Sequence, residues 1–590
     1  MLNSNIEDPI VFDTKYNIET AMKLENIIHT NYKNNKKAED LLTEFPTVYV
    51  INARNSHNTF SVYVGETNDI QRRTIEHLGE DPEIREDFDD FRESKNAQIF
   101  VIGQEHFNKS ITLDIENRLM QYLSGVPTVT KLTNRRFNEQ NKYYDSDEFD
   151  ELFDKIWSKL NKKSPSLFPD RNELKNKAIF KASPFNKLTI EQQRVKEKVI
   201  VKIDRALQKN NKDNQAKLIL IEGNAGSGKT VLVSNIFYDL IHENRLANKK
   251  FKISIIVNQD EQLKVYEEIV NKLFPKEFNI RVLKPATFIN STTIKGKDDI
   301  VIVDEAHLLL TQNSQAYYGH GKRMIEDILK RAKVVLAVFD PGQILSIDSI
   351  IDENYMSDLV DKTDGETLVL ENQMRIDASE ATIDWIRSLI DKDQILPIPK
   401  DNKYEIKIFD DPAKMQQEIT TINQTQFNGI SRMVATFDWQ YSGGKAKLPV
   451  GQEYWQVSEG NWKMPWNHEI KRRDAYEKKH RNKLVKYSDL PWAEKDYTIG
   501  EIGSLYTVQG FDLNYVGVVL GPSVKYRNGK IVHDPLESQN KKATNKLHSS
   551  QSYAEKLLRN EFNVLMTRGV HGLYIYAVDP ELRTALKNCK

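Results

Sequence analysis

The chain has 590 residues, and its 84 Lys and Arg nearly balance its 85 Asp and Glu, which gives a net charge of −1. This length predicts three or four domains, and the balanced charge confines any nucleic-acid surface to a local patch. The single cysteine, Cys589, excludes a disulfide framework and a Cys-based zinc site. The N-terminus lacks a signal-peptide core and no apolar run reaches about 18 residues, so we expect a cytoplasmic protein without membrane contact.

The first 145 residues predict a helical extension followed by a small αβ domain. Residues 1–44 are polar and predict helices. The segments Thr47–Ile51 and Phe60–Val64 are rich in β-branched and aromatic residues, which favours a hairpin with a long loop. A helix is expected from about Ile70, and a later one, at Thr112–Leu123, contains Glu116.

Several positions in this region resemble the GIY-YIG nuclease family, and they are Tyr49, Tyr63, Gly65, Arg73, His77, Glu116 and Asn134. The first triplet reads Thr-Val-Tyr instead of Gly-Ile-Tyr, and the loop between the two tyrosine strands is longer than in the family. The resemblance implies a nuclease domain over 45–145 that hydrolyses phosphodiester bonds.

Within that resemblance, one Mg²⁺ on Glu116 would stabilise the charge at the reacting phosphate, and Arg73 would bind the scissile phosphate. Tyr49, Tyr63 or His77 would activate or position the attacking water. Two alternatives stay open. One is a small αβ domain whose tyrosines and histidine are ordinary structural residues, and the other is a domain of this fold that binds nucleic acid without cutting it.

A connection is predicted over 146–181. The acidic stretch Asp145–Asp154 favours a solvated helix, and Asn161–Arg171 has the Ser, Pro and Lys content of a linker.

A phosphate-binding loop is predicted at Leu218–Thr230, LILIEGNAGSGKT, where a strand, a glycine-rich turn and a helix follow one another. The glycines let backbone N–H groups face phosphate oxygens, and the helix N-terminus adds partial positive charge. Lys229 is expected to reach the β and γ phosphates, and the Thr230 hydroxyl to ligate Mg²⁺. We therefore expect ATP and Mg²⁺ as ligands, with the loop contacts made by Gly223, Gly226 and Gly228.

Two buried strands are expected to bring acid and amide groups to the same edge of a sheet. Asp299–Val303 leads to Asp304, which would hold Mg²⁺ through water, and to Glu305, which would polarise the attacking water. Val334–Phe339 ends shortly before Gln343, which can sense the γ-phosphate.

The order of these motifs resembles superfamily 1 helicases from about Ala182 to Asp579. The residues within the motifs resemble most the bacterial helicase-like ATPases related to the C-terminal module of Schlafen proteins. The resemblance implies two RecA-like lobes, over 182–365 and 366–590, that close on ATP. Its implied site residues are Gln192 for adenine, Arg568 as an arginine finger, Arg375 as a second γ-phosphate contact, and Gln509 and Gly510 as the link to a bound strand. From the residues alone, the Leu-Thr-x-x-Gln at Gln192 is equally a helix N-cap at Thr189.

An insertion at about 443–496 combines aromatic and basic side chains, which are Trp455, Trp462, Trp466, Trp492, Lys471, Arg472, Arg473, Lys478, Lys479, His480 and Arg481. This composition fits single-strand binding by stacking and phosphate contacts, and it fits a small subdomain with buried tryptophans equally well.

We therefore expect an α/β protein in which a GIY-YIG nuclease precedes two RecA-like parallel-sheet lobes. Its function would be Mg²⁺-dependent cleavage of nucleic acid coupled to ATP hydrolysis, with translocation or unwinding, in bacterial defence against phage or foreign DNA. The expected partners are nucleic acid, DNA rather than RNA, and either a second copy of the chain or a protein of a defence operon. The alternatives are an ATP-switched RNA or tRNA nuclease without unwinding and an ATPase with a non-cutting module.

Overall fold

The computed structural model describes residues 7–55, 57–79, 88–134, 149–175, 177–208, 215–246, 251–275, 279–291, 296–311, 323–351, 354–425, 429–442, 446–467, 490–545 and 551–589. Within these ranges no helix is both long and apolar enough to cross a membrane. The chain divides into two compact units. Unit 1 comprises Met1–Lys187, Phe237–Ala247 and Glu267–Glu277, and unit 2 comprises Leu188–Ile236, Asn248–Tyr266 and Phe278–Lys590.

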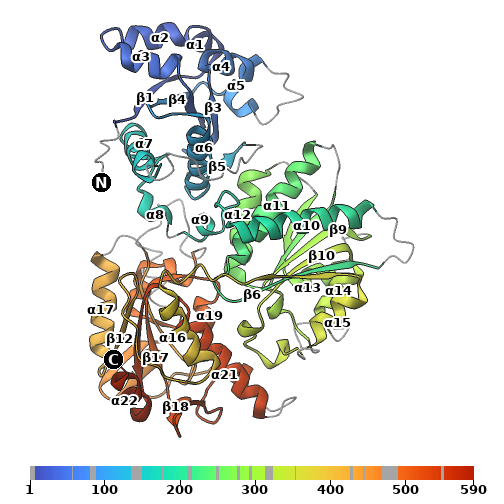
Figure 1. Cartoon of the computed structure of the whole chain (residues 1–590), viewed down its shortest axis with the longest axis vertical. Helices are drawn as coiled ribbons and strands as arrows, with labels where there is room; N and C mark the ends of the chain where they lie inside the picture. Colours follow the sequence, from blue (N-terminus) through green and yellow to red (C-terminus); the bar gives the residue numbers. More distant parts are fainter. Residues whose placement is uncertain are drawn as a thin grey trace. The chain divides into compact units, whose positions relative to one another are not determined.

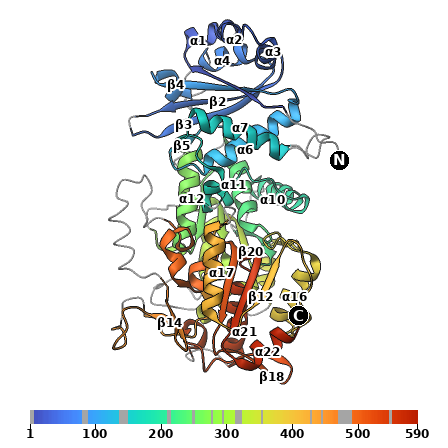
Figure 2. The same cartoon turned by 90° about the vertical axis from the view of Figure 1, so that its left-hand side faces the viewer.

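Unit 1 is built on a five-stranded sheet of order β1-β4-β2-β3-β5. Its strands are β1 (Ile10–Lys15), β2 (Thr47–Arg54), β3 (Phe60–Thr67), β4 (Ala97–Gly103) and β5 (Val129–Leu132). All pairs are antiparallel except β3 with β5. Seven of the eight residues of β2 are buried, because helices cover both faces of the sheet (Figure 2).

The helices on one face of this sheet are α1 (Ile18–Met22), α2 (Leu24–Asn31), α3 (Lys36–Thr43), α4 (Ile70–Gly79) and α5 (Asp89–Glu93). Leu24, Ile28 and Leu42 join Phe12 of β1 in the core on this face. Residues 10–15 form an edge strand that pairs with β4. Residues 1–44 were expected to be mostly helical, and this strand is the part of the region that the expectation did not include.

The other face carries α6 (Lys109–Ser124) and α7 (Phe149–Lys163), followed by α8 (Arg171–Lys175) and α9 (Ala178–Lys181). Helix α7 buries six side chains, including Phe153 and Trp157, and the Trp157 indole N–H donates to the carbonyl oxygen of Pro169 at 2.8 Å. The segment expected to be a solvated linker is therefore a packed part of unit 1. Its acidic residues mark only the solvent side of an amphipathic helix.

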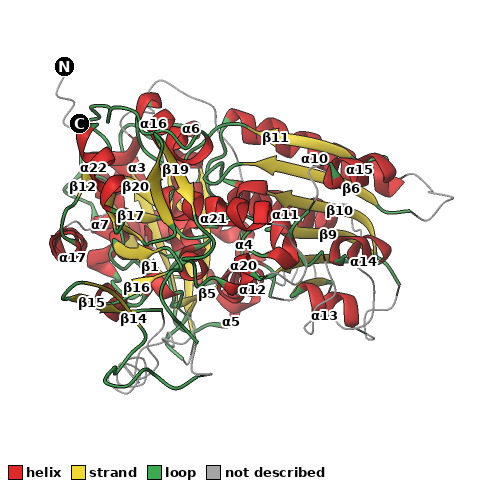
Figure 3. Cartoon of the chain, turned by 90° about the horizontal axis from the view of Figure 1, so that it is seen from below, coloured by secondary structure: helices red, strands yellow, loops and turns green. Residues whose placement is uncertain are grey.

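Unit 2 contains two separate parallel sheets. The first has the order β11-β6-β10-β9-β7-β8, and Figure 3 shows β11, β6, β10 and β9 side by side. Its strands are β6 (Lys217–Gly223), β7 (Ile253–Val257), β8 (Ile280–Leu283), β9 (Asp298–Asp304), β10 (Ala332–Phe339) and β11 (Glu366–Leu370). All five strand pairs are parallel.

Helices cover both faces of this sheet (Figure 1). They are α10 (Ile190–Gln208), α11 (Lys229–Leu246), α12 (Asp260–Leu273), α13 (Pro285–Asn290), α14 (Met324–Lys330) and α15 (Tyr355–Lys362). Since parallel strands need crossover connections, their carboxyl ends meet at one edge, where the predicted phosphate loop follows β6 and the Asp-Glu pair ends β9.

The second sheet of unit 2 is also parallel throughout, with the order β12-β20-β17-β13-β16. Its strands are β12 (Glu405–Ile408), β13 (Arg432–Ala435), β16 (Ile502–Gly503), β17 (Leu513–Leu520) and β20 (Gly569–Ala577). The accompanying helices are α16 (Glu380–Asp391), α17 (Pro412–Thr425), α19 (Leu505–Val508), α20 (Lys541–Thr544), α21 (Gln551–Met566) and α22 (Pro580–Asn588). Two parallel sheets with helical crossovers confirm the expected α/β class.

The tryptophan-rich insertion contains a hairpin, β14 (Gln456–Glu459) with β15 (Trp462–Pro465), and a second hairpin follows later, β18 (Val524–Arg527) with β19 (Lys530–His533). Trp466 and Trp492 are each 1% exposed and belong to the cores of unit 2, whereas Trp455 and Trp462 are half-buried. Two of the four tryptophans therefore have a structural role. The basic residues from Lys471 to Arg481 lie outside the described residues.

Candidate ATPase and nuclease sites

The phosphate loop has the backbone that its glycines were expected to provide. Gly226 and Gly228 adopt φ of 88° and 74°, a left-handed conformation that other residues rarely take. Lys229 is buried and turns back into the loop, where its Nζ donates to the carbonyl oxygens of Gly223 at 2.7 Å and Asn224 at 2.8 Å. The lysine is thus held at the mouth of the turn in which phosphates would lie.

Gln192 forms one wall of this loop. Its Nε2 donates to the carbonyl oxygen of Ser227 at 3.0 Å, and its Oε1 accepts from the backbone N–H of Thr189 at 2.9 Å. The Thr189 hydroxyl accepts from the Gln192 N–H at 3.2 Å, so both motif residues cap the start of α10. The amide therefore braces the phosphate loop in this structure, and its contact with adenine stays a prediction.

The opposite wall comes from the segment that precedes α16. The backbone N–H of Met374 donates to the carbonyl oxygen of Gly226 at 2.8 Å. A methyl group at Gly226 would lie 2.8 Å from Cβ of Arg375, so the glycine is also required for this close approach. Arg375 is half-buried, and its Nε pairs with a carboxylate oxygen of Asp512. The structure therefore brings Arg375 beside the phosphate loop.

Asp304 lies at the carboxyl end of β9 and is fully enclosed by donors. Its Oδ2 accepts from the Tyr266 hydroxyl and from Nε2 of Gln262, each at 2.7 Å, and its Oδ1 accepts from the backbone N–H of Glu305. Gln262 also lies 3.5 Å from the Thr230 hydroxyl. Burial, with the charge of Glu305 beside it, raises the pKa of Asp304.

Glu305 has a left-handed backbone, with φ of 55°, which is uncommon for a residue with a side chain and costs about 1–3 kcal/mol. Its Oε2 lies 3.0 Å from Nε2 of the buried His307. Burial opposes the charged form of Glu305, but His307, Lys229 and Arg568 hold the pKa of its carboxyl below the usual value. A strained, ionised carboxylate at this sheet edge suits a group that polarises water.

A continuous chain of polar contacts runs from the phosphate loop to the second sheet of unit 2. Nζ of Lys229 lies 3.1 Å from Oδ2 of Asp340, and the same oxygen accepts from Nε2 of Gln343 at 2.6 Å. Oε1 of Gln343 in turn lies 3.5 Å from Nη2 of Arg568. Gln343 therefore stands between the loop lysine and the predicted arginine finger.

Arg568 is fully buried at the end of α21. Its Nε donates to the carbonyl oxygen of Val564 at 2.7 Å, and its Nη1 lies 3.3–3.4 Å from the carbonyl oxygens of Val508 and Phe511. Burial and the nearby Arg375 lower the pKa of Arg568 to about 9, so it stays charged near pH 7. Four polar contacts of the guanidinium, three to carbonyl oxygens and one to the Gln343 side chain, thus fix its position.

The two residues expected to couple the ATP state to a strand lie in the same region. Nε2 of Gln509 approaches the carbonyl oxygen of Gln343 at 3.5 Å. Gly510 has a φ of 86° and lies close to Gln259. The structure thus brings Gln509 to the Gln343 segment, and the coupling role of both residues stays a prediction.

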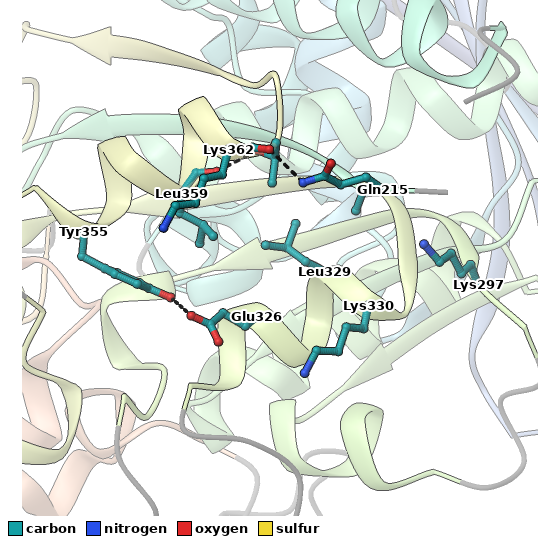
Figure 4. Close-up of a pocket in the computed structure, with 10 residues that line it drawn as sticks. Gln215, Lys297, Glu326, Leu329, Lys330, Tyr355, Leu359 and Lys362 are labelled. Carbon is teal, nitrogen blue, oxygen red and sulfur yellow. Dashed lines mark hydrogen bonds between the residues drawn. The ribbon is translucent and has the colours of Figure 1, made fainter. Parts of the chain in front are cut away.

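A cavity of about 440 Å³ lies on the first sheet of unit 2, lined by residues just before β6 and β9 and by residues of α14 and α15 (Figure 4). Its polar groups are engaged with neighbours: the Tyr355 hydroxyl donates to Glu326 at 2.7 Å, and Gln215 donates to the carbonyl oxygen of Lys362 at 2.8 Å. The cavity faces the strand starts and belongs to the opposite edge from the phosphate loop.

In unit 1, the two matched tyrosines and the matched histidine form a buried cluster. The hydroxyl of Tyr49 and Nε2 of His77 share a hydrogen bond of 2.9 Å. The ring of Tyr63 packs edge-on against His77 with centroids 5.1 Å apart. Burial raises the pKa of Tyr49 well above its ordinary value, so its phenol stays protonated and orients neighbours rather than removing a proton.

Gly65 is required by this cluster. It lies directly opposite Tyr49 in the β2–β3 register, and a Cβ at this position would be 2.5 Å from the Tyr49 hydroxyl oxygen and Cζ. The tyrosine ring therefore crosses the neighbouring strand at the one place that has no side chain.

Glu116 of α6 is 8% exposed, and Nδ2 of Asn134 lies 3.4 Å from its Oε1. Burial and the nearby Glu66 raise the pKa of Glu116 to about 8. Glu66 also pairs with Lys109, and its second carboxylate oxygen is buried without a hydrogen-bond partner among the described residues. The site thus combines two carboxyl groups and one amide.

Arg73 of α4 reaches the same cluster. Burial alone would lower its pKa, but a hydrogen bond to Tyr49 and an ion pair with Glu76 at 3.1 Å raise it, so Arg73 stays positively charged. The charge of Glu116 in turn raises the pKa of Tyr49. The structure therefore brings together six of the residues predicted for this site, which are Tyr49, Tyr63, Arg73, His77, Glu116 and Asn134.

The donor sets at both sites suit Mg²⁺, which prefers carboxylate, hydroxyl and water oxygens and needs few protein ligands. Thr230 and Asp304 would hold the ion in unit 2, with Asp304 acting through water, and Glu116 would hold it in unit 1. Across the described ranges, no group of three or more His, Cys, Asp or Glu is arranged as a complete metal cage. Either site would therefore complete its coordination with water or phosphate oxygens.

Several residues of these sites were not predicted, and they are Tyr266, Gln262, His307, Asp340, Asp512 and Glu66. Asp340 and His307 adjoin recognised motif positions, so their place next to a strand end was a usable signal. Tyr266 and Gln262 lie on α12, more than thirty residues before their partner Asp304. Nothing in the local sequence pattern joins them to it.

Comparison with protein families supports the assignment of unit 2. The model of the Schlafen group 3 DNA/RNA helicase domain matches residues 216–579, which is more than half of the chain. An uncharacterised protein of Saccharomyces cerevisiae, YPL245W, is 30% identical over 436 residues, covering 68% of this chain and 90% of the relative.

Solved structures of helicases share low sequence identity with the chain. The Pif1 helicase of Candida albicans is 12% identical, with a TM-score of 0.27, covering 68% of this chain and 97% of that one. The DUF1998 helicase MrfA bound to DNA is 10% identical, with a TM-score of 0.29 and coverage of 68% and 51%. The SWI2/SNF2 ATPase core of Sulfolobus solfataricus with double-stranded DNA is 11% identical, with a TM-score of 0.25 and coverage of 66% and 88%.

Proposed function

The chain belongs to the Schlafen group 3 helicase family, and we propose that it is an ATP-driven nucleic-acid enzyme whose unit 1 is, in addition, a Mg²⁺-dependent nuclease. The family makes it a helicase-like ATPase. The observation that supports the ATPase assignment most directly is the series of contacts Lys229–Asp340–Gln343–Arg568. These contacts connect the phosphate loop at the first parallel sheet with Arg568, which lies just past the end of α21 at the second parallel sheet.

The two ends of this series of contacts, Lys229 and Arg568, would act in ATP hydrolysis together with the acidic pair at the end of β9. Lys229 would exchange Asp340 for phosphate oxygens, and Glu305 would orient the attacking water. Arg568 would approach the γ-phosphate and offset the charge that develops there, because it is held by carbonyl oxygens and stays charged. Mg²⁺, when bound, would neutralise phosphate charge, with Thr230 and Asp304 as its protein contacts.

Coupling to nucleic acid follows from the two-sheet arrangement. ATP would bridge the phosphate loop and Arg568, and its hydrolysis would remove that bridge. If both sheets hold a strand, the cycle produces translocation or unwinding. If they do not, it is a switch that controls cleavage, including cleavage of RNA or tRNA. ATP turnover measured together with unwinding on DNA and RNA separates the two alternatives.

The ATPase assignment is tested by ATP hydrolysis with variants of Arg568, which lies just past the end of α21, and of Arg559 on α21 itself. Lys229→Ala and Arg568→Lys are expected to lower turnover by at least about 100-fold. Arg559→Lys is the matched control, because Arg559 is exposed on α21 and pairs with Asp393. Equal turnover by Arg568→Lys and Arg559→Lys would remove Arg568 from the mechanism.

The nuclease proposal is supported by the buried cluster around Glu116. Arg73 would bind the scissile phosphate, since it is charged and held in place by Tyr49 and Glu76. The Tyr49–His77 pair would position water. Mg²⁺, when bound, would stabilise the charge of the leaving oxygen, and the raised pKa of Glu116 means that its proton must leave for the ion to bind.

Cleavage assays on single- and double-stranded DNA and RNA test this proposal. Glu116→Gln and Arg73→Ala are expected to reduce cleavage by about 100-fold or more. Arg72→Ala is the matched control, because the neighbouring Arg72 is exposed and pairs with Glu76 on the same helix and with Asp69 just before it. A wild-type protein that binds these substrates and cuts none would favour the non-cutting module.

The biological setting of this activity stays a prediction from domain architecture. A role in defence against phage or foreign DNA rests on the fusion of a nuclease with an ATPase, and a role for a second copy or an operon partner rests on the same analogy. The relative in Saccharomyces cerevisiae shows that similar chains are not confined to bacteria. Phage plating on cells that carry wild type or Arg73→Ala tests the defence role.

A further inference from the structure

Two segments from the helicase part of the sequence are integral parts of unit 1. They are Phe237–Ala247, on the later turns of α11, and Glu267–Glu277, which includes the end of α12. Each segment places one polar side chain against the elements that carry the candidate nuclease residues. These side chains are Tyr238 and Lys272.

Tyr238 is 3% exposed, and its hydroxyl donates to the backbone carbonyl oxygen of Asn134 at 3.2 Å. Three aromatic rings surround its own ring, with centroid distances of 5.2 Å to Phe185, 5.8 Å to Phe274 and 6.4 Å to His242. This packing fixes the side-chain torsions. The position of the hydroxyl therefore follows the position of α11.

Asn134 connects that hydroxyl to the candidate site. Its side-chain Oδ1 accepts from the backbone N–H of Val64 at 3.0 Å, and its Nδ2 donates to the carbonyl oxygen of Val64 at 2.7 Å. The same Nδ2 lies 3.4 Å from Glu116. Since Val64 stands between Tyr63 and Gly65, Asn134 holds both the tyrosine strand and the proposed metal ligand.

Lys272 acts on the helix that carries Glu116. It is 5% exposed, and its Nζ donates to the carbonyl oxygens of Ser124 at 2.9 Å and Val126 at 3.1 Å. These carbonyls lie at the end of α6, where a positive charge is favourable to the helix dipole. The later segments thus contact both Asn134, which borders Glu116, and the end of the helix that carries Glu116.

Helix α11 begins at Lys229, so Tyr238 lies nine residues along the same helix from the phosphate-loop lysine. At 1.5 Å per residue this is about 14 Å of continuous helix. We propose that Tyr238 is a positioning residue of the nuclease site and that α11 passes the occupancy of the phosphate loop to Asn134. This proposal rests on the proposed nuclease function of unit 1.

The physical reason is that ligand binding acts on the first turn of α11. There Lys229 is bound to Gly223, Asn224 and Asp340, and phosphates would replace these contacts and engage the N–H groups of the same turn. A shift of the first turn moves the whole helix, because its backbone hydrogen bonds make it stiff. Tyr238, fixed in its aromatic surroundings, transmits that shift to the carbonyl group of Asn134.

Hydrogen exchange of the full-length protein, with no nucleic acid present, tests the proposal independently of cleavage. The Val64 amide is the reporter, because its proton is held by the Asn134 side chain. Tyr238→Phe is expected to raise its exchange rate about fivefold, the effect of losing one ordinary hydrogen bond. Tyr122→Phe is the matched control, because it removes a buried hydroxyl on α6 that bonds Arg171.

The non-hydrolysable analogue AMP-PNP with Mg²⁺ supplies the second arm. It is expected to change the exchange of Val64 in wild type and to leave it unchanged in Tyr238→Phe, while protecting residues 223–230 in both. The proposal is overturned if the analogue protects the phosphate loop in wild type but leaves the exchange rate of the Val64 amide unchanged. It is also overturned if Tyr238→Phe and Tyr122→Phe change that exchange rate equally. A wild type that never cuts nucleic acid overturns the nuclease function instead, whatever the exchange shows.

Discussion

At the scale of single residues, the candidate nuclease site depends on a missing side chain at Gly65. A Cβ there would lie 2.5 Å from the Tyr49 hydroxyl, much closer than side-chain atoms can approach. We expect Gly65→Ala to displace Tyr49 from His77 and lower cleavage about tenfold or more, as shifts of about 1 Å in a catalytic group do. Cleavage rates measure the loss of activity, and circular dichroism in the aromatic region reports on the displacement of Tyr49.

Gly79→Ala is the control for this substitution. Gly79 ends α4 near His77, and a methyl group there meets no atom within 4 Å. Alanine in a helix is at least as favourable as glycine, so this variant should keep full activity. Equal losses in both variants would show that the steric argument at Tyr49 is wrong.

His533 makes the stability of unit 2 depend on pH. Its ring is buried against Phe562, both ring nitrogens lack a hydrogen-bond partner among the described residues, and burial lowers its pKa to about 4. The unfolded chain, with a pKa near 6.5, binds the proton more strongly. The contribution of His533 is therefore complete above about pH 6.5 and is lost as the pH falls towards 4.

Between pH 7.5 and pH 5 this loss amounts to about 2 kcal/mol of the free energy of unfolding. His533→Gln, which cannot gain the proton, should lose about 2 kcal/mol less than wild type over the same range. Denaturant unfolding at the two pH values measures the difference. Parallel losses in wild type and variant would refute the argument.

At the scale of elements, α21 holds the segment that carries the proposed γ-phosphate sensor. Asn563 donates to the carbonyl oxygen of Gly342 at 3.0 Å, and Asn560 donates to those of Ile344 at 2.9 Å and Pro341 at 3.2 Å. Because these bonds end on backbone atoms around Gln343, α21 and the sensor segment must move together. Arg568 at the end of the same helix shares that movement.

We expect Asn563→Ala to lower the stimulation of ATP hydrolysis by nucleic acid about fivefold, the worth of one lost hydrogen bond, while ATP binding persists. Steady-state ATPase assays with and without single-stranded DNA measure this ratio. Glu555→Ala is the control, because Glu555 is exposed on the same helix. A normal stimulation ratio in Asn563→Ala would exclude the sensor segment from coupling.

Elements with local signals could be predicted from the sequence, and elements defined by distant partners could not. The strand, glycine turn and helix at Leu218–Leu240 needed only adjacent residues, and β9 with its Asp-Glu pair followed the same rule. The edge strand β1 was missed because its pairing with β4 joins residues nearly ninety positions apart. The sequence predicts a solvated helix at Asp145–Asp154 within a linker, because the acidic residues there outweigh the apolar stripe by which α7 packs.

The same distinction holds within the sites. Lys229, Glu305 and Glu116 belong to short motifs, so their positions were predicted before any contact was known. Tyr266, which holds Asp304, lies on α12, and only the folded sheet brings it there. The tryptophans of the insertion were ambiguous for a similar reason, since burial of Trp466 and Trp492 depends on distant elements.

At the scale of the whole molecule, the chain combines an antiparallel-based sheet in unit 1 with two parallel sheets in unit 2. The succession of motifs predicted this order. It did not predict that Phe237–Ala247 and Glu267–Glu277 belong to unit 1, because both segments lie within helices that follow strands of the ATPase fold. The two units are therefore not consecutive in the sequence, because unit 1 includes two segments that lie within the sequence of unit 2.

The central claim is that one chain carries two separable phosphate chemistries. The most direct test measures ADP release and oligonucleotide cleavage in the same Mg²⁺-containing sample for wild type, Arg73→Ala and Lys229→Ala. We predict that Arg73→Ala abolishes cleavage and keeps ATP hydrolysis, whereas Lys229→Ala abolishes ATP hydrolysis. Cleavage that survives in Arg73→Ala, or ATP hydrolysis that disappears with it, would contradict the claim.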